Sequence, residues 1–96
     1  INSFGANNGF IQYDEYGFGG GDWVGSTPLR GGAWHHVLAT FRDSGNEVKL
    51  YVNGALDFNH SLTRNYDESA HVVKIGSSGS TNAQRFFGGS IDEVRI

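Results

Sequence analysis

The chain has 96 residues, which is enough for one hydrophobic core but not for two. Seven phenylalanines, four tyrosines and two tryptophans, with 38% apolar residues, indicate a folded chain, and the lack of cysteine excludes disulfides and thiol chemistry. A formal charge of −3 gives no electrostatic reason to bind nucleic acid, and no apolar run is long enough to span a bilayer.

The first third of the chain predicts two short strands between glycine-rich loops. No window combines helical spacing of apolar residues with a capping signal, so helix is not expected. Residues 9–13 and 22–25 are predicted as strands, and residues 14–21 as the turn-rich stretch between them. Residues 26–32 contain the only proline and are predicted as a loop.

The middle of the chain predicts two successive β-hairpins. Residues 43–46 have the composition of a turn, and Asn53-Gly54 is the strongest two-residue hairpin turn in the sequence. Val48, Leu50 and Val52 recur at every second position and are expected to face the core. The strands joined by these turns are predicted at 34–42, 47–52 and 55–58.

The last part of the chain predicts two more strands, and Ile75 and Ile91 are expected to face the core from them. Ile91 and Val94 are three residues apart, so either both faces of the last strand are covered or a bulge lies at Asp92-Glu93. The predicted segments are polar surface loops at 59–69 and 77–83 and strands at 70–76 and 85–96.

Six or seven strands without a helix predict an all-β fold, which is either an antiparallel sandwich or an antiparallel barrel. Strands with one apolar and one polar face fit the sandwich better, so an antiparallel two-sheet β-sandwich is expected. The length of the chain predicts that residues 1–96 form a single domain.

Three segments carry a family resemblance. They are WHHVLAT at 34–40, VKLYVNG at 48–54, and IG at 75–76 followed by FGGSIDEVRI at 87–96. Together and in this order they resemble a laminin-G-like domain of the concanavalin A-like lectin/glucanase superfamily. The resemblance implies a jelly roll with two facing antiparallel sheets.

The resemblance also implies a non-catalytic module, extracellular or on the cell surface, that binds glycans, other proteins or surfaces. Family members are usually longer than this chain, so we expect it to be a fragment or a subunit of a larger protein. A shortened jelly roll leaves open sheet edges, which predicts self-association or completion by a strand from a neighbouring chain.

Motifs for catalysis do not occur in the sequence, and no enzymatic activity is predicted. Adjacent carboxylates such as Asp14-Glu15 point to opposite faces of a strand and could not flank one glycosidic bond. The E-x-D-x-x-E spacing of jelly-roll glucanases and the G-x-S-x-G of serine hydrolases are missing. His35 and His36 are neighbours on a predicted strand and cannot both face one metal.

Calcium is a candidate cofactor, because members of the resembled superfamily often bind it at the sandwich rim through aspartates and backbone carbonyls. Asp22 and Asp92 are the candidate ligands. The alternative for Asp92 is that its carboxylate accepts hydrogen bonds from nearby loop N–H groups. Residues 77–82 carry no carboxylate, so a pentraxin-type calcium site is not expected there.

Carbohydrate binding needs an aromatic ring for the pyranose face and polar side chains for the hydroxyl groups. Two predicted loops offer both. The candidate ligand-binding residues are Tyr16, Asp22 and Trp23 in the first loop and Arg64, Asn65, Tyr66 and Asp67 in the second. The alternative for Trp23 is a place in the core, and Trp34 is expected to be a core residue.

Asn59-His60-Ser61 is an N-glycosylation sequon at the expected start of a surface loop, and it matters only in a eukaryotic secretory context. The function that these features predict is a non-catalytic extracellular recognition or adhesion module, with carbohydrate as the first ligand to test. Two alternatives stay open: a structural building block of a filament, fibre or surface scaffold, and an accessory domain of a glycoside-processing enzyme.

Overall fold

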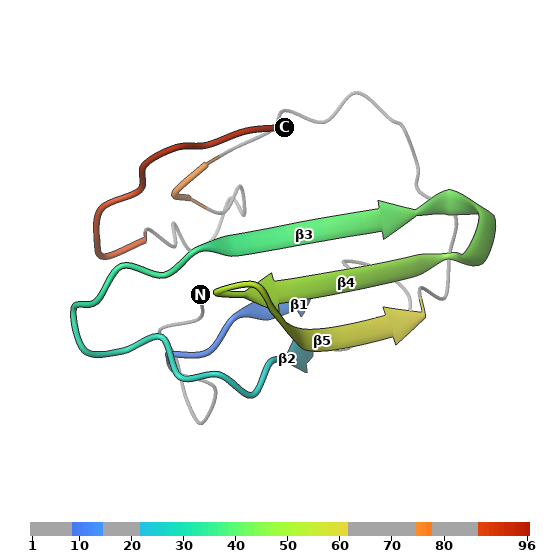
Figure 1. Cartoon of the computed structure of the whole chain (residues 1–96), viewed down its shortest axis with the longest axis horizontal. Coiled ribbons are helices and arrows are strands. Elements are labelled where there is room, and N and C mark those ends of the chain that lie inside the picture. The colour runs from blue at the N-terminus through green and yellow to red at the C-terminus, as the bar shows by residue number, and fades with distance from the viewer. Residues whose placement is uncertain (1–8, 15–21, 62–74, 78–86) are drawn as a thin grey trace. The chain divides into compact units, whose positions relative to one another are not determined.

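The structure is a computed structural model that describes residues 9–14, 22–61, 75–77 and 87–96 (Figure 1). The chain forms two compact units, Ile1–Tyr66 and Asp67–Ile96. In the described part of the first unit, five strands form two antiparallel sheets, one of two strands and one of three.

The two-stranded sheet pairs β1 (Gln12–Asp14) with β2 (Asp22–Val24), and Tyr13 lies opposite Trp23. The pairing continues beyond the two strands, where the Gly25 N–H donates a hydrogen bond to the Ile11 carbonyl at 2.9 Å. The strand predicted at 9–13 therefore begins later than expected. The delay has a local cause: Gly9 has φ +94°, which is left-handed rather than extended backbone.

The three-stranded sheet contains β3 (Val37–Arg42), β4 (Glu47–Val52) and β5 (Ala55–Ser61), with β4 in the middle (Figure 1). A short 3-10 helix, η2 (Asp43–Gly45), connects β3 to β4. Asn53 and Gly54, with φ of 51° and 82°, form the tight turn from β4 to β5 that such an Asn-Gly pair favours. Both predicted hairpins are confirmed.

Two strand boundaries in this sheet differ from the prediction. Residues 34–36 precede β3 and take no part in its ladder, whereas β5 continues through Ser61. The surface loop predicted at 59–69 is therefore wrong over residues 59–61, and its remaining residues lie outside the described part. Asn59 pairs with Lys49 and His60 with Val48, so polar composition at this sheet edge did not signal the end of the strand.

The core of the first unit lies between the two sheets. Val48, Leu50 and Val52 of β4 are 0%, 5% and 3% exposed, as their alternation predicts. Ile11, directly before β1, packs against Leu50 and Val52, and Tyr13, Leu29 and Phe58 lie around this cluster. Each fully buried aliphatic side chain contributes about 1.5–3 kcal/mol. The fold is the expected all-β arrangement of two antiparallel sheets.

Trp34 is not the core residue that the sequence predicts, because 70% of its surface is exposed. Gly31 and Gly32 both have positive φ, and the chain enters the ladder only at Val37, so Trp34 lies before the strand rather than within it. All of β3 is exposed along its length. Only the middle strand of the sheet thus carries the full alternation of buried and exposed residues.

The second unit is described over Ile75–Ser77 and residues 87–96, which form no strand there. The strand predicted at 85–96 is wrong over residues 87–96, since Glu93 adopts φ 52° and interrupts the extended backbone. This interruption falls at the Asp92-Glu93 position where the sequence pattern breaks. A hydrogen bond from the Phe87 N–H to the Gly76 carbonyl, at 2.8 Å, joins the two described segments.

Ile75 and Ile91 are also not the core residues that the sequence predicts. They are 55% and 48% exposed, and Val94 is 51% exposed. Ile75 and Gly76 lie in a bend, so the predicted strand at 70–76 does not reach its last two residues, and residues 70–74 lie outside the described part. A side chain in such a bend has no ladder to direct it toward an apolar layer.

Candidate functional site

Five ring-bearing residues from four strands form an aromatic cluster: Tyr13, Trp23, Phe41, Phe58 and His60. The Tyr13 and Trp23 rings, on β1 and β2, have centroids 6.0 Å apart. The Trp23 ring lies against the imidazole of His60 on β5, with centroids 3.9 Å apart and planes at 30°. The cluster therefore joins the two sheets through ring contacts.

Phe41 brings the aromatic cluster to the surface. Its ring centroid lies 6.4 Å from that of Tyr13, at an interplanar angle of 53°, and Phe41 is 54% exposed. At the other end of the cluster Phe58 stacks on His60 at 6.0 Å and packs against the core. The rings thus run from the buried core to solvent, which is the arrangement of a supported aromatic surface.

Strand register explains why these rings meet. Val48 of β4 lies opposite both Phe41 of β3 and His60 of β5, and residues opposite each other in a sheet share a face. Val48 is fully buried, so this shared face is the one turned toward the β1–β2 sheet, where Tyr13 and Trp23 are paired. The β3–β4 and β4–β5 registers therefore place Phe41 and His60 on the same face as the buried Val48, where they meet the rings of the other sheet.

A small charged group lies at the same end of the sheet as Phe41 but on the opposite face, because neighbouring strand residues point to opposite faces. The Arg42 guanidinium and the Lys49 ammonium both contact Oε2 of Glu47, at 3.0 and 3.2 Å. The Arg42 side chain is 65% exposed, while the shared carboxylate is only 18% exposed. One carboxylate between two cations leaves a net positive charge on the outer face of the sheet.

Asp57 holds the loop after β2 against β5. Leu50 pairs with Phe58 and Tyr51 with Leu56, so Asp57 is the extra residue of a β-bulge. Its Oδ1 accepts hydrogen bonds from the Thr27 N–H at 2.8 Å, from the Thr27 hydroxyl, and from the Ser26 N–H and hydroxyl at 3.3 and 3.2 Å.

The bonds to Asp57 determine its titration. Partial burial raises the pKa of Asp57, but the hydrogen bonds from Thr27 and Ser26 lower it by more, so that it lies below its usual 3.8. Oδ2 is buried and has no hydrogen-bond partner among the described residues, and it packs on Gly25. Asp57 therefore fixes the segment that directly follows Trp23.

Asn53 organises the opposite end of the sheet. Its N–H donates to the His36 carbonyl at 2.8 Å, and its Oδ1 accepts the His36 N–H at 3.0 Å. The Asn53 amide nitrogen also lies 3.1 Å from Nδ1 of His35. These bonds attach the residues before β3 to the β4–β5 turn, which is a structural role for the histidine pair.

The structure describes only part of the predicted site. Trp23 lies in the aromatic cluster and is half-buried, so it combines the two roles that the sequence left open. Asp22 is the first residue of β2 and pairs with Asp14. Tyr16, Arg64, Asn65, Tyr66 and Asp67 lie outside the described residues. Asn59 is exposed but belongs to β5 rather than to the start of a loop.

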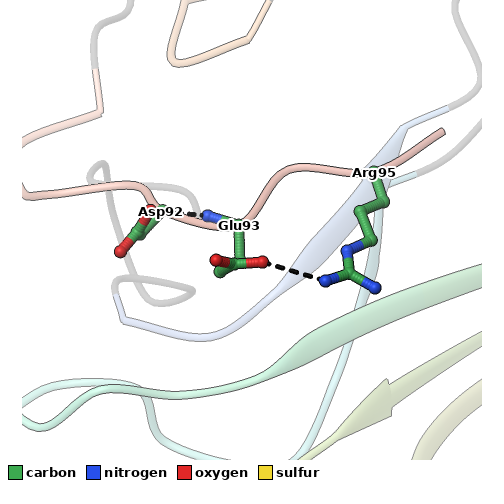
Figure 2. Close-up of polar contacts among 3 residues, drawn as sticks. All are labelled: Asp92, Glu93 and Arg95. Carbon is green, nitrogen blue, oxygen red and sulfur yellow. Dashed lines mark hydrogen bonds and ion pairs between the residues drawn. The ribbon is translucent and has the colours of Figure 1, made fainter.

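Asp92 makes the hydrogen bond that was the alternative to calcium binding. Its Oδ1 accepts the Glu93 N–H at 2.8 Å, and the Glu93 carboxylate contacts Arg95 at 3.1 Å (Figure 2). Among the described residues no three histidine, aspartate or glutamate side chains gather as metal ligands. Calcium binding by Asp22 or Asp92 stays a prediction.

Four residues of the aromatic cluster were not predicted as site residues from the sequence: Tyr13, Phe41, Phe58 and His60. A signal was available for Phe41. With the turns at 43–46 and Asn53-Gly54 fixing the hairpins, counting back from the buried Val48 places Phe41 on its face. His60 could not be reached in this way, because the bulge at Asp57 shifts the register by one residue.

Comparison with known proteins gives the family. A family model described as the concanavalin A-like lectin/glucanases superfamily, of laminin-G type, matches residues 2–96. No curated protein and no solved structure matches the chain. Laminin-G-like domains are generally non-catalytic, are typically extracellular and commonly bind glycans or extracellular proteins. In the described part of the chain no helix is long and apolar enough to cross a membrane. The chain belongs to the concanavalin A-like lectin/glucanase superfamily and is a lectin-like or adhesion module in general character.

Proposed function

We propose that the chain is a non-catalytic recognition module that binds carbohydrate at its aromatic cluster. The observation that carries the proposal is the exposed ring of Phe41, which is 54% exposed and supported from behind by Tyr13. A ring held in place by other rings presents its face at little entropic cost, because its rotamer is already restricted. This is the surface that the C–H face of a pyranose needs.

The polar contacts that a sugar needs are expected from other residues, because Arg42, Glu47 and Lys49 point to the outer face of the sheet and Phe41 to the inner one. Carboxylates and amides of Tyr16–Trp23 and Arg64–Asp67 stay predicted contributors.

The experiment compares two variants with equal exposure in the parent. Phe41→Ala removes the proposed sugar-binding ring, and Leu56→Ala removes an apolar side chain that is also 54% exposed and lies outside the cluster. After a glycan array has identified a ligand, calorimetry with that glycan should show roughly tenfold weaker binding for Phe41→Ala, as expected from a contact worth about 0.5–1.5 kcal/mol plus buried area.

The Leu56→Ala variant should bind the glycan like the parent. Equal losses in the two variants would place the ligand elsewhere or reveal a general loss of structure, which circular dichroism would detect. A parent protein that binds nothing on the array, with or without calcium in the buffer, would contradict the proposed function. The calcium arm also tests the prediction for Asp22 and Asp92, since a loaded site raises the melting temperature.

A further inference from the structure

The Asn53 side chain is held between two groups whose chemistry bears on its carboxamide. Its Oδ1 accepts the His36 N–H at 3.0 Å, and its amide nitrogen lies 3.1 Å from Nδ1 of His35. Because a backbone N–H can only donate, the atom that faces His36 is the carbonyl oxygen, and the amide nitrogen therefore faces the imidazole. Both ends of this carboxamide thus have a partner of the kind that assists acyl transfer.

The residue after Asn53 supplies a nucleophile. The peptide nitrogen of Gly54 follows Asn53 directly, and attack of this nitrogen on Cγ of Asn53 closes a succinimide ring. A glycine crowds the forming ring least, because it has no side chain. A Cβ built on Gly54 would meet no atom of the described residues within 4 Å, so the turn is open on this side.

The fold holds these groups together at a position that water can reach. Asn53 and Gly54 are exposed, whereas His35 is half-buried. The Asn53 N–H also donates to the His36 carbonyl at 2.8 Å, so the main chain and the side chain of Asn53 both hold the residues before β3 against the β4–β5 turn. The carboxamide and its two partners are therefore in place before any reaction begins, which removes much of the entropic cost of bringing them together.

We propose that Asn53 is a site of self-catalysed deamidation, in which His35 and the His36 N–H promote loss of the side-chain amide as ammonia. The Gly54 nitrogen gives its proton to water and forms a bond to Cγ of Asn53. The bond between Cγ and the amide nitrogen then breaks, and ammonia leaves. Water opens the succinimide ring to aspartate or isoaspartate, so the net reaction consumes one water and releases one ammonia.

Each partner of the carboxamide has a role in this reaction. As the Gly54 nitrogen attacks, negative charge develops on Oδ1 of Asn53, and the His36 N–H stabilises this charge as the donor of an oxyanion hole does. The departing nitrogen must gain a proton, and the protonated imidazole of His35 donates one from Nδ1 across the observed contact. Imidazole is suited to this role because it exchanges protons near neutral pH.

The reaction requires one rotation within the turn and changes the turn afterwards. Asn53 has φ 51°, and rotation about its Cα–C bond brings the Gly54 nitrogen to Cγ. Gly54, at φ 82°, tolerates this change because glycine adopts both signs of φ. Isoaspartate adds a methylene group to the main chain and so lengthens the β4–β5 turn, whereas aspartate keeps an oxygen that can accept the His36 N–H.

The test follows deamidation of the full chain at neutral pH. Intact mass and peptide mapping record the replacement of the Asn53 amide by a carboxyl group, and chromatography of the peptides separates isoaspartate from aspartate. A positioned general acid contributes about 10²–10⁴-fold, and exposure to water reduces this, so the folded parent should react at least about tenfold faster than the parent in guanidinium chloride. The denatured chain keeps Asn53-Gly54 but no longer holds the histidines against it. Asn46, which has φ 45° but precedes Glu47, should stay unchanged in the folded sample.

Two substitutions separate the imidazole from a general loosening of the segment before β3. His35→Gln keeps a polar side chain but cannot supply the proton, so it should slow deamidation at Asn53 about tenfold. Trp34→Ala is the matched control, because this ring is adjacent in the sequence, is 70% exposed and has no role in the reaction, and it should react like the parent.

A folded parent that reacts no faster than the denatured chain would overturn the proposal, since the hydrogen bonds to Asn53 would then protect it. The proposal is also wrong if His35→Gln reacts at the parent rate, or if Trp34→Ala slows the reaction as much as His35→Gln does. Circular dichroism checks that each variant is folded. If one is not, the comparison of the folded and the denatured parent decides alone.

Discussion

Replacing Asp57 with alanine tests whether one carboxylate joins the two sheets of the first unit. In the folded protein Oδ1 of Asp57 accepts hydrogen bonds from the backbone and side chain of both Ser26 and Thr27, across 30 and 31 residues of sequence. Asp57→Ala removes the acceptor and leaves these donors to water. Thr27→Val removes the hydroxyl alone and keeps the backbone donor, so it serves as the graded comparison.

The expected loss follows from the number and geometry of these bonds. The two bonds from Thr27 are short, whereas those from Ser26 are 3.2 and 3.3 Å long and are weaker. A hydrogen bond to a charged group contributes about 1.5–3 kcal/mol, and partial exposure lets water compensate for some of it. Asp57→Ala should therefore lower the free energy of unfolding by about 2–3 kcal/mol, and Thr27→Val by about 1 kcal/mol.

Acid should reduce the same contribution. The pKa of Asp57 is lower in the folded protein than its usual 3.8, so the ionised carboxylate favours the folded state. This stabilisation is complete well above pH 3.8 and is lost as the pH falls through the folded pKa. The difference in stability between the parent and Asp57→Ala should accordingly be constant near neutrality and should narrow below pH 4.

Urea denaturation measures these changes, with intrinsic fluorescence reporting mainly on Trp23, since Trp34 is already 70% exposed in the folded protein. For a domain of this size each kcal/mol corresponds to roughly 4–8 °C in melting temperature, so calorimetry provides an independent check. The reasoning fails if Asp57→Ala unfolds within 0.5 kcal/mol, or roughly 3 °C, of the parent, or if its difference from the parent is unchanged at pH 3.

Two further substitutions test contacts within the first unit, one at Gly25 and one at Asn53. Gly25→Ala places a Cβ that overlaps Asp57 Oδ2, so it should lower the free energy of unfolding by about 1–3 kcal/mol. Gly88→Ala is the control, because its Cβ meets open space, and it should stay within about 0.5 kcal/mol of the parent in the same urea denaturation. Asn53→Ala loses the hydrogen bond from the His36 N–H and places alanine at φ 51°, so it should lower the free energy of unfolding by about 2 kcal/mol. Asn53→Gly loses the same bond but tolerates this φ, so its loss should be smaller.

The part of the fold that the sequence predicts well is the part determined by neighbouring residues. The turn at 43–46 and the Asn53-Gly54 turn each join strands that pair with their immediate neighbours, and Val48, Leu50 and Val52 show which face is buried. Local turn chemistry and a period of two are sufficient for such a meander. The bounds of β4 match the prediction to the residue.

The predictions that failed depended on contacts with distant parts of the chain. Trp34, Ile75 and Ile91 are large and apolar, and burial was inferred from that character, yet each is about half or more exposed. An apolar side chain is buried only where another layer covers it, and composition does not say which layer that is. The strand predicted at 85–96 failed over residues 87–96 for a local reason as well, because Glu93, where the alternation breaks, has a positive φ.

The candidate site was only partly predictable for a related reason. Trp23 was identified because an aromatic residue among glycines is a recognisable signal, but the ring that reaches solvent is Phe41, which looks like an ordinary strand residue. Its role depends on Tyr13, which lies 28 residues before Phe41 in the chain (41 − 13) and meets it only through the packing of two sheets. The register within a hairpin can be predicted from its turn and its alternation, whereas the packing of one sheet on another cannot be predicted from these local signals.

β3 and β4 have different roles within one small sheet, and β4 supplies most of its core. It is paired on both edges and buried on one face, so its alternation serves the core and leaves it little freedom to carry function. Its neighbour β3 is paired with β4, is exposed along its length and presents the Phe41 ring on the face where Val48 is buried. A sugar would contact this ring through its C–H face, so the proposed binding role belongs to β3 while β4 holds the core.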